Sequence, residues 1–189
     1  MSTPIKMNNN YSISKESILA KYTNINSFFK SCINAFYGDY NTGIEVNCFL
    51  PCNIIVNGAN NKLSILNILK GKSGVYIFLD SDRIPVYIGK GGTSKKLTGT
   101  DLKSRVGQEL RAGSIGNTLS KNIIDIESEL QNKNISKEFS IDNLIKNFSL
   151  LTITVCDRVA NNEIDEVNIL KAEALEMVFI ALFHPKYNK

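Results

Sequence analysis

Two tyrosines lie on neighbouring segments whose composition is typical of β-strands. Tyr76 belongs to the segment 75–80, and Tyr87 belongs to the segment 86–90. A two-residue turn at Ser81 and Asp82 would place Tyr76 directly opposite Tyr87, and cross-strand partners project from the same face of a hairpin. Both phenols would then project together, within about 5.5 Å of one another at Cβ. Taken alone, this pattern is that of a packing pair.

The other positions of this hairpin predict its surroundings. Alternate residues form its core face: Val75, Ile77, Leu79, Val86 and Ile88. Gly89 leaves a gap in side-chain cover beside Tyr87, which favours the close approach of a ligand or of another backbone segment.

A carboxylate with apolar neighbours occurs late in the chain. Glu176 lies within a predicted helix from Asn162 to Phe183, and Ala172 and Phe179 flank it one turn away on either side. A carboxylate on a partly apolar face is costly unless it is paired or bound to a cation. Glu173 lies on the same side of this helix. A salt bridge at the rim of the core and a metal site are both consistent with this pattern.

Basic residues are concentrated in the middle of the sequence. The chain of 189 residues has a net charge of +4, and the segment 90–111 alone carries six basic and two acidic residues, which gives the same net charge. The basic residues are Lys90, Lys95, Lys96, Lys103, Arg105 and Arg111. Such a concentration indicates a polyanionic partner, although a solvated helix face has the same composition.

The order of these residues resembles the GIY-YIG nuclease superfamily. Residues 74–76 read GVY, with valine in place of the usual isoleucine, and residues 87–89 read YIG. An arginine on the following helix, Arg105, and a late Glu176 continue the pattern, which ends at Asn188. The resemblance covers residues 74–188. Many restriction-type members carry a histidine one turn after the arginine, where this chain has Glu109.

The resemblance implies a site for Mg²⁺ or Mn²⁺ on Glu176. One such cation needs few carboxylates, because water molecules complete its coordination. Arg105 is expected to hold a phosphate oxygen, because its guanidinium donates two parallel hydrogen bonds. Asn188 is expected to orient groups of the active site.

The resemblance also assigns the two tyrosines. Tyr76 is expected to act as the general base in its phenolate form, while Tyr87 holds the water or the phosphate. A phenol has an ordinary pKa of about 10, so it needs a neighbouring cation to act near neutral pH. Lys90 is the expected cation. Side chains alternate along a strand, and Lys90 lies three residues after Tyr87, so its side chain should project from the opposite face. A bulge or the strand end must therefore redirect it toward the tyrosines.

The elements that must position these residues indicate an α+β fold. Strands and helices alternate without regular βαβ spacing, which favours a small central β-sheet built on the hairpin and flanked by helices, as in the GIY-YIG nuclease core. We expect residues 1–70 to form an N-terminal extension, with a DNA-recognition role, and residues 71–189 to form the nuclease core. An insertion is expected at about residues 113–148.

Composition sets further limits. The apolar fraction of 43% suits a folded core, and the apolar runs are too short to cross a membrane. The first residues do not read as a secretory signal, so a cytoplasmic protein is expected, and its four cysteines are not expected to form disulfides.

The function predicted is a divalent-metal-dependent DNA endonuclease that leaves 5′-phosphate and 3′-hydroxyl ends. A type II restriction endonuclease, acting as a homodimer without a nucleotide cofactor, fits best. A structure-selective or single-strand nuclease of repair or phage biology and a toxin-like nuclease are the alternatives, as is a DNA-binding module with an inactive site.

Base recognition is expected in the insertion, because it is rich in the amide and basic side chains that read base edges. Asn117, Lys121 and Asn122 are the candidates there, although polar loops have the same composition.

Overall fold

The chain folds around one small antiparallel β-sheet. The computed structural model describes residues 25–37, 44–49, 62–95, 99–110, 117–131, 147–157, 159–160, 163–164 and 166–189. The sheet contains four strands in the order β1-β4-β2-β3. These are β1 (Glu45–Phe49), β2 (Lys72–Leu79), β3 (Pro85–Gly91) and β4 (Ser149–Asp157). The expected α+β class and the central hairpin, β2–β3, are confirmed.

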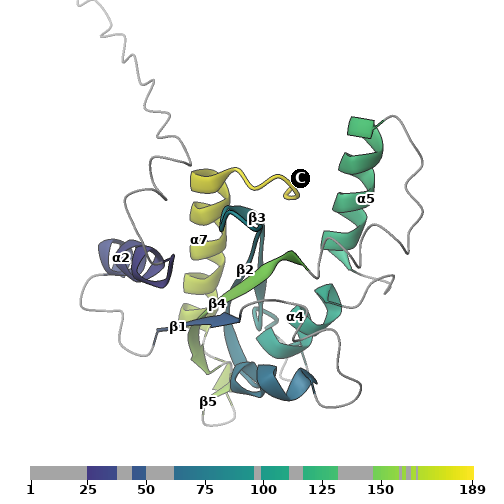
Figure 1. The fold of residues 1–189 in the computed structure, drawn as a ribbon. Helices are drawn as coiled ribbons and strands as arrows, with labels where there is room; N and C mark the ends of the chain where they lie inside the picture. The colour runs from purple at the N-terminus through teal and green to yellow at the C-terminus, as the bar shows by residue number, and fades with distance from the viewer. Residues whose placement is uncertain are drawn as a thin grey trace, which may run out of the picture.

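Helices cover both faces of the sheet (Figure 1). They are α2 (Ile25–Tyr37), the 3₁₀ helix η2 (Lys62–Leu69), α4 (Leu102–Glu109), α5 (Thr118–Gln131) and α7 (Glu166–Phe183). A separate two-stranded ribbon joins β5 (Val159–Ala160) to β6 (Glu163–Ile164). Within the described part of the chain, no helix combines the length and the apolarity needed to span a bilayer. Asn162, the expected start of the last helix, lies outside the described residues.

Two hydrophobic cores lie on the two sides of the sheet. One core joins α7 and α2 to the hairpin, through contacts such as that between Phe29 and Phe179. The other core lies under α4, η2 and the C-terminal tail, and it includes Tyr76 and Tyr87. Because both faces are covered, β2 is buried from Ser73 to Leu79, as expected for a central strand with a continuous apolar sequence.

The predicted core face is confirmed at four of five positions. Val75, Ile77, Leu79 and Ile88 pack toward α7. Val86 is the exception, because it belongs to the core on the other face. The pairing changes from Phe78 with Tyr87 to Leu79 with Pro85, so Val86 is an extra residue in β3. A bulge of this kind locally reverses the alternation of side chains.

The predicted hairpin register is wrong by two residues. Tyr76 pairs with Gly89, and Tyr87 pairs with Phe78. The turn is longer than two residues: the N–H of Arg83 donates to Asp80 O, and Arg83 itself has a φ of 63°. A left-handed residue after a turn is typical of three-residue hairpin loops. Since the shift is even, Tyr76 and Tyr87 still share one face.

The C-terminal tail covers part of the open edge of β3. His184 ends α7 with a φ of 44°, and Pro185 follows it. The N–H of Tyr187 then donates to Val86 O over 2.8 Å. The side chain of Asn188 accepts from the N–H of Ile88 over 2.8 Å and donates to its carbonyl over 2.7 Å. One amide therefore replaces a missing neighbouring strand at Ile88.

Replacing Asn188 by alanine should lower the free energy of unfolding by about 1–3 kcal/mol, because it leaves both backbone groups of Ile88 without their partner. Denaturation in urea measures this change. Lys189→Ala is the control, because it removes only an exposed ion pair with Asp125, worth about 1 kcal/mol or less. Equal effects of the two substitutions would contradict the role of Asn188 as a surrogate strand.

Candidate active site

A cleft of about 390 Å³ opens at the uncovered end of β3. It is lined by five residues that the sequence predicted to be catalytic: Tyr76, Tyr87, Lys90, Arg105 and Glu176. The rest of its lining consists of Gly89, the loop from Gly91 to Ser94, and Thr100. The sixth predicted residue, Asn188, does not line the cleft but supports β3 just before the cleft begins.

The edge position of β3 explains how both sheet faces contribute to one cleft. The tyrosines come from the face covered by α4, whereas Lys90 pairs with Val75 and projects toward α7. The expectation that a bulge or strand end redirects Lys90 to the tyrosine face is therefore wrong. Among the strands that the structure describes, none lies beyond β3, so side chains on both faces of the sheet can line a cleft at this edge.

The glycines of the two sequence motifs are required by packing. A Cβ atom on Gly89 would lie 2.4 Å from the Tyr76 hydroxyl oxygen, because the tyrosine ring crosses the strand there. A Cβ atom on Gly74 would lie 2.1 Å from Ile153 O of β4. The gap expected beside Tyr87 is thus filled by the side chain of Tyr76.

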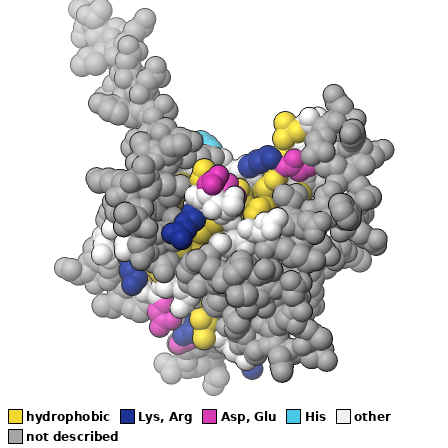
Figure 2. All heavy atoms as spheres, viewed as in Figure 1, with side chains coloured by type: hydrophobic (Ala, Val, Ile, Leu, Met, Phe, Trp, Pro, Cys, Tyr) yellow, Lys and Arg dark blue, Asp and Glu magenta, His cyan; other side chains and the backbone are white. Residues whose placement is uncertain are grey.

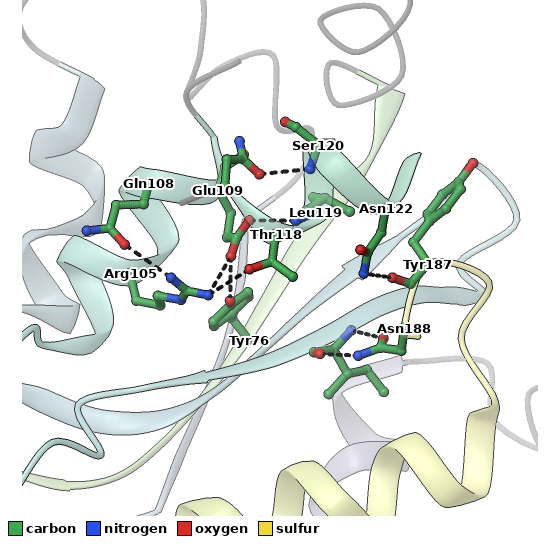
Figure 3. A network of polar contacts seen from close by, with 12 residues as sticks. Tyr76, Arg105, Gln108, Glu109, Thr118, Leu119, Ser120, Asn122, Tyr187 and Asn188 are labelled. Atoms are coloured by element: carbon green, nitrogen blue, oxygen red, sulfur yellow. Dashed lines mark hydrogen bonds and ion pairs between the residues drawn. The ribbon is translucent and has the colours of Figure 1, made fainter. Parts of the chain in front are cut away.

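A buried carboxylate connects Tyr76 to Arg105 (Figure 3). Glu109 is fully buried, and one of its oxygens, Oε1, accepts from the Tyr76 hydroxyl over 3.2 Å. The same oxygen lies 3.1 Å from Nη2 of Arg105. The other oxygen accepts from the N–H of Leu119, in the first turn of α5, over 2.9 Å. The carboxylate therefore holds β2, α4 and α5 together.

Arg105 is fixed by further contacts from the same side. Nη1 donates to Gln108 Oε1 over 3.3 Å, and Nη2 donates to Thr118 Oγ1 over 3.2 Å (Figure 3). Its guanidinium is therefore held in one orientation at the wall of the cleft.

Burial changes the proton affinities of these groups. It raises the pKa of Tyr76 well above its ordinary value and that of Tyr87 to about 12. Both phenols are therefore protonated at neutral pH. The positive charge of Arg105 acts in the opposite direction on both tyrosines. Arg105, and not Lys90 as the sequence interpretation expected, is therefore the cation that lowers the pKa of the two phenols.

Glu109 was missed as a site residue by the sequence interpretation. Burial raises the pKa of its carboxyl group, although the N–H of Leu119 and the charge of Arg105 oppose this. A carboxylate with a raised pKa is a better proton acceptor than an exposed one. Its position one turn after Arg105 was the available signal, because residues four apart on a helix are neighbours.

The opposite wall of the cleft carries a second set of paired charges. Nζ of Lys90 lies 3.1 Å from Glu176 Oε2 and 3.3 Å from Glu173 Oε1. Burial lowers the pKa of Lys90, but the two carboxylates outweigh this and raise it. Only Glu176 of the two lines the cleft. No group of three or more metal-ligating side chains occurs among the described residues.

The predicted DNA-binding residues that the structure describes are paired with acidic or polar side chains. Lys95 lies 3.4 Å from Glu166, and Lys103 donates to Asn67. On the face shown in Figure 2, the described Lys and Arg side chains stand apart, and several have Asp or Glu beside them. Lys96 and Arg111 lie outside the described residues. Contact between these residues and DNA stays a prediction.

Two amides predicted to read bases are buried instead. Asn117 caps α5, since it accepts from the N–H of Ser120 and donates to Glu109 O. Asn122 donates to Tyr187 O. Their surroundings leave no access to base edges, so the recognition role proposed for them is wrong. Lys121 is exposed.

Comparisons of the chain with protein-family models, with curated proteins and with solved structures found no match.

The pH dependence of folding tests the burial of Glu109. Its pKa is raised above the ordinary 4.5 in the folded protein, so its contribution to stability is complete below about pH 4.5 and declines as the pH rises through the raised value. We compare the free energy of unfolding of the wild type with that of Glu109→Gln. The difference, wild type minus variant, should therefore decrease as the pH rises through this window. Urea denaturation between about pH 4 and 8 measures it, because Tyr76, Tyr87 and Arg105 titrate above this range. An increase of the difference with pH would mean that pairing with Arg105 outweighs burial.

Proposed function

We propose that this cleft is the active site of a divalent-metal-dependent DNA endonuclease. The observation that carries the proposal is the convergence of Tyr76, Tyr87, Arg105 and Glu176 on one cleft from separate elements. These residues were selected from sequence order alone, and 100 positions separate the first from the last. A set of unrelated surface and core residues has no reason to meet in one cleft.

The donor chemistry of the cleft fits Mg²⁺ or Mn²⁺. Glu176 presents an oxygen ligand to the cleft, and its side chain is 17% exposed. One carboxylate together with water and phosphate oxygens suits such ions. When bound, the cation supplies a Lewis acid that offsets negative charge on the scissile phosphate and on the leaving oxygen. Glu176 is the residue that would hold it, in exchange for its ion pair with Lys90.

The proton of the attacking water is taken by a tyrosine and a carboxylate together. Because burial keeps Tyr76 protonated, the phenol needs to lose its own proton as it accepts one. Glu109 is placed to receive it, since its Oε1 already accepts the Tyr76 hydroxyl hydrogen bond. The water proton passes to the Tyr76 oxygen, and the Tyr76 proton passes to Glu109. Tyr87 holds the water or a phosphate oxygen.

The fixed guanidinium of Arg105 binds a non-bridging phosphate oxygen. Its contacts with Glu109, Gln108 and Thr118 orient it before the substrate arrives, so little reorganisation is needed during the reaction. Hydrolysis with these roles leaves 5′-phosphate and 3′-hydroxyl ends. A restriction enzyme remains our prediction for the biological role, and a ladder of discrete fragments from plasmid DNA is the result that it requires.

Glu176→Gln should reduce cleavage of plasmid DNA in Mg²⁺ by at least about 10²-fold, because it removes the charge that holds the cation. Binding of DNA, measured by fluorescence anisotropy, should change little. Glu173→Gln is the matched control: it is on the same helix and also contacts Lys90, but does not line the cleft. If Glu173→Gln were the inactive variant, the ligand assignment would be wrong, and full wild-type activity in excess chelator would refute the metal requirement.

Tyr76→Phe should lower the cleavage rate by about 10²-fold or more, the range expected for loss of a general base. Glu109→Gln should lower it too, because an amide cannot accept the phenol proton, and should flatten the acidic limb of the pH–rate profile. Tyr87→Phe is the comparison and should have the smaller effect. A larger defect in Tyr87→Phe than in Tyr76→Phe would exchange the two roles.

A further inference from the structure

The outward side of α7 carries an apolar stripe. Val167, Leu170 and Met177 are 66%, 59% and 69% exposed, although they are large hydrophobic residues. Ala174 and the exposed Ala181 lie on the same side of the helix. The opposite side of α7 packs on the sheet, through residues such as Phe179 and Phe183. A helix at a protein surface normally has a polar outward side, so this apolar stripe indicates an interaction surface.

The spacing of the stripe is that of a helix–helix seam. Its members are separated by three, four, three and four residues, which is the heptad pattern of helices that pack along their length. The other exposed large hydrophobic residues in the described part of the chain, Ile68 and Leu130, lie on different elements. The concentration on α7 is therefore specific to this helix.

We propose that this stripe is the contact surface between two copies of the chain, in which the two α7 helices lie parallel about a two-fold axis. A stripe from Val167 to Ala181 forms a seam about 21 Å long, at 1.5 Å per residue. Such a seam buries less area than a permanent dimer does, so the association is reversible, with a dissociation constant on the order of 10 µM.

The charges beside the stripe favour the parallel arrangement. Heptad spacing places Glu166 and Glu173 along one flank and Lys171 along the other. Two parallel helices bring opposite flanks together, so Glu166 lies beside Lys171 of the partner subunit. Antiparallel helices bring equal flanks together, and glutamate would then face glutamate. Glu166 is well exposed, and its partner among the described residues is the exposed Lys95, a contact that it can exchange for this one.

The proposed interface lies beside the cleft without including its lining. Glu173 flanks the stripe and also contacts Lys90, which lines the cleft. Two clefts would therefore flank one seam. Exposure, spacing and charge of α7 indicate this interface, and none of them depends on the proposed nuclease activity.

Sedimentation equilibrium of the full chain without DNA, from about 1 to 200 µM, tests the proposal. The wild type should shift from monomer to dimer across this range. Leu170→Glu should remain monomeric, because the new charges would meet at the seam. Leu130→Glu is the matched control and should dimerise like the wild type, since it makes the same change at an exposed leucine of α5. A wild type that stays monomeric throughout, or a Leu170→Glu variant that still dimerises, would overturn the proposal.

The orientation has its own test. Val167→Cys should form a cross-linked dimer under mild oxidation, because a parallel seam brings the two substituted positions together, whereas an antiparallel seam separates them by well over the reach of a disulfide. The wild type treated in the same way accounts for cross-links through its own cysteines. A dimer that gives no additional cross-link with Val167→Cys would refute the parallel arrangement.

Discussion

The buried carboxylate of Glu109 is the constraint on which the side of the fold that carries the cleft depends. A fully buried carboxylate is costly unless its oxygens are satisfied. Here a phenol on β2, a guanidinium on α4 and a backbone N–H at the start of α5 satisfy them. Moving any of these elements removes one of the partners of the charge. The same contacts that stabilise the fold therefore hold Tyr76 and Arg105 in fixed positions at the cleft.

The second constraint is the uncovered edge of β3. The tail occupies this edge at Val86 and Ile88, and the cleft begins at the next residue, Gly89. An unprotected strand edge invites pairing with another chain, so its coverage has a value independent of catalysis. Beyond Ile88, none of the described strands pairs with this edge, and side chains from both sheet faces reach it. Tyr87 and Lys90 therefore line the same cleft although they project from opposite faces.

The sequence was sufficient to predict which residues meet, but not how they meet. Tyr76, Tyr87 and Arg105 were found from motif order, and the α+β class followed from the pattern of strands and helices. The register depended on a left-handed Arg83 and a bulge at Val86, and neither residue type signals such a conformation. Glu109 was overlooked because an acidic residue on a polar helix resembles a solvated one until its burial is known. Asn117 was misinterpreted because the same side chain can cap a helix or read a base, and the sequence alone does not distinguish these roles.

The charges of the cleft and its immediate surroundings give an argument for a metal that is separate from any resemblance. Lys90 and Arg105 contribute two positive charges, whereas Glu109, Glu173 and Glu176 contribute three negative ones. Each cation is already paired, so a phosphodiester that enters must compete with carboxylates for both. Under the proposed function, a divalent cation held by Glu176 would change this balance from −1 to +1. Glu176 would then hold Lys90 less strongly, which would leave the Lys90 ammonium available to the phosphate. Under the same proposal, the scissile phosphate would be held productively at the cleft only when the cation is present, whereas DNA bound elsewhere on the protein would not depend on it.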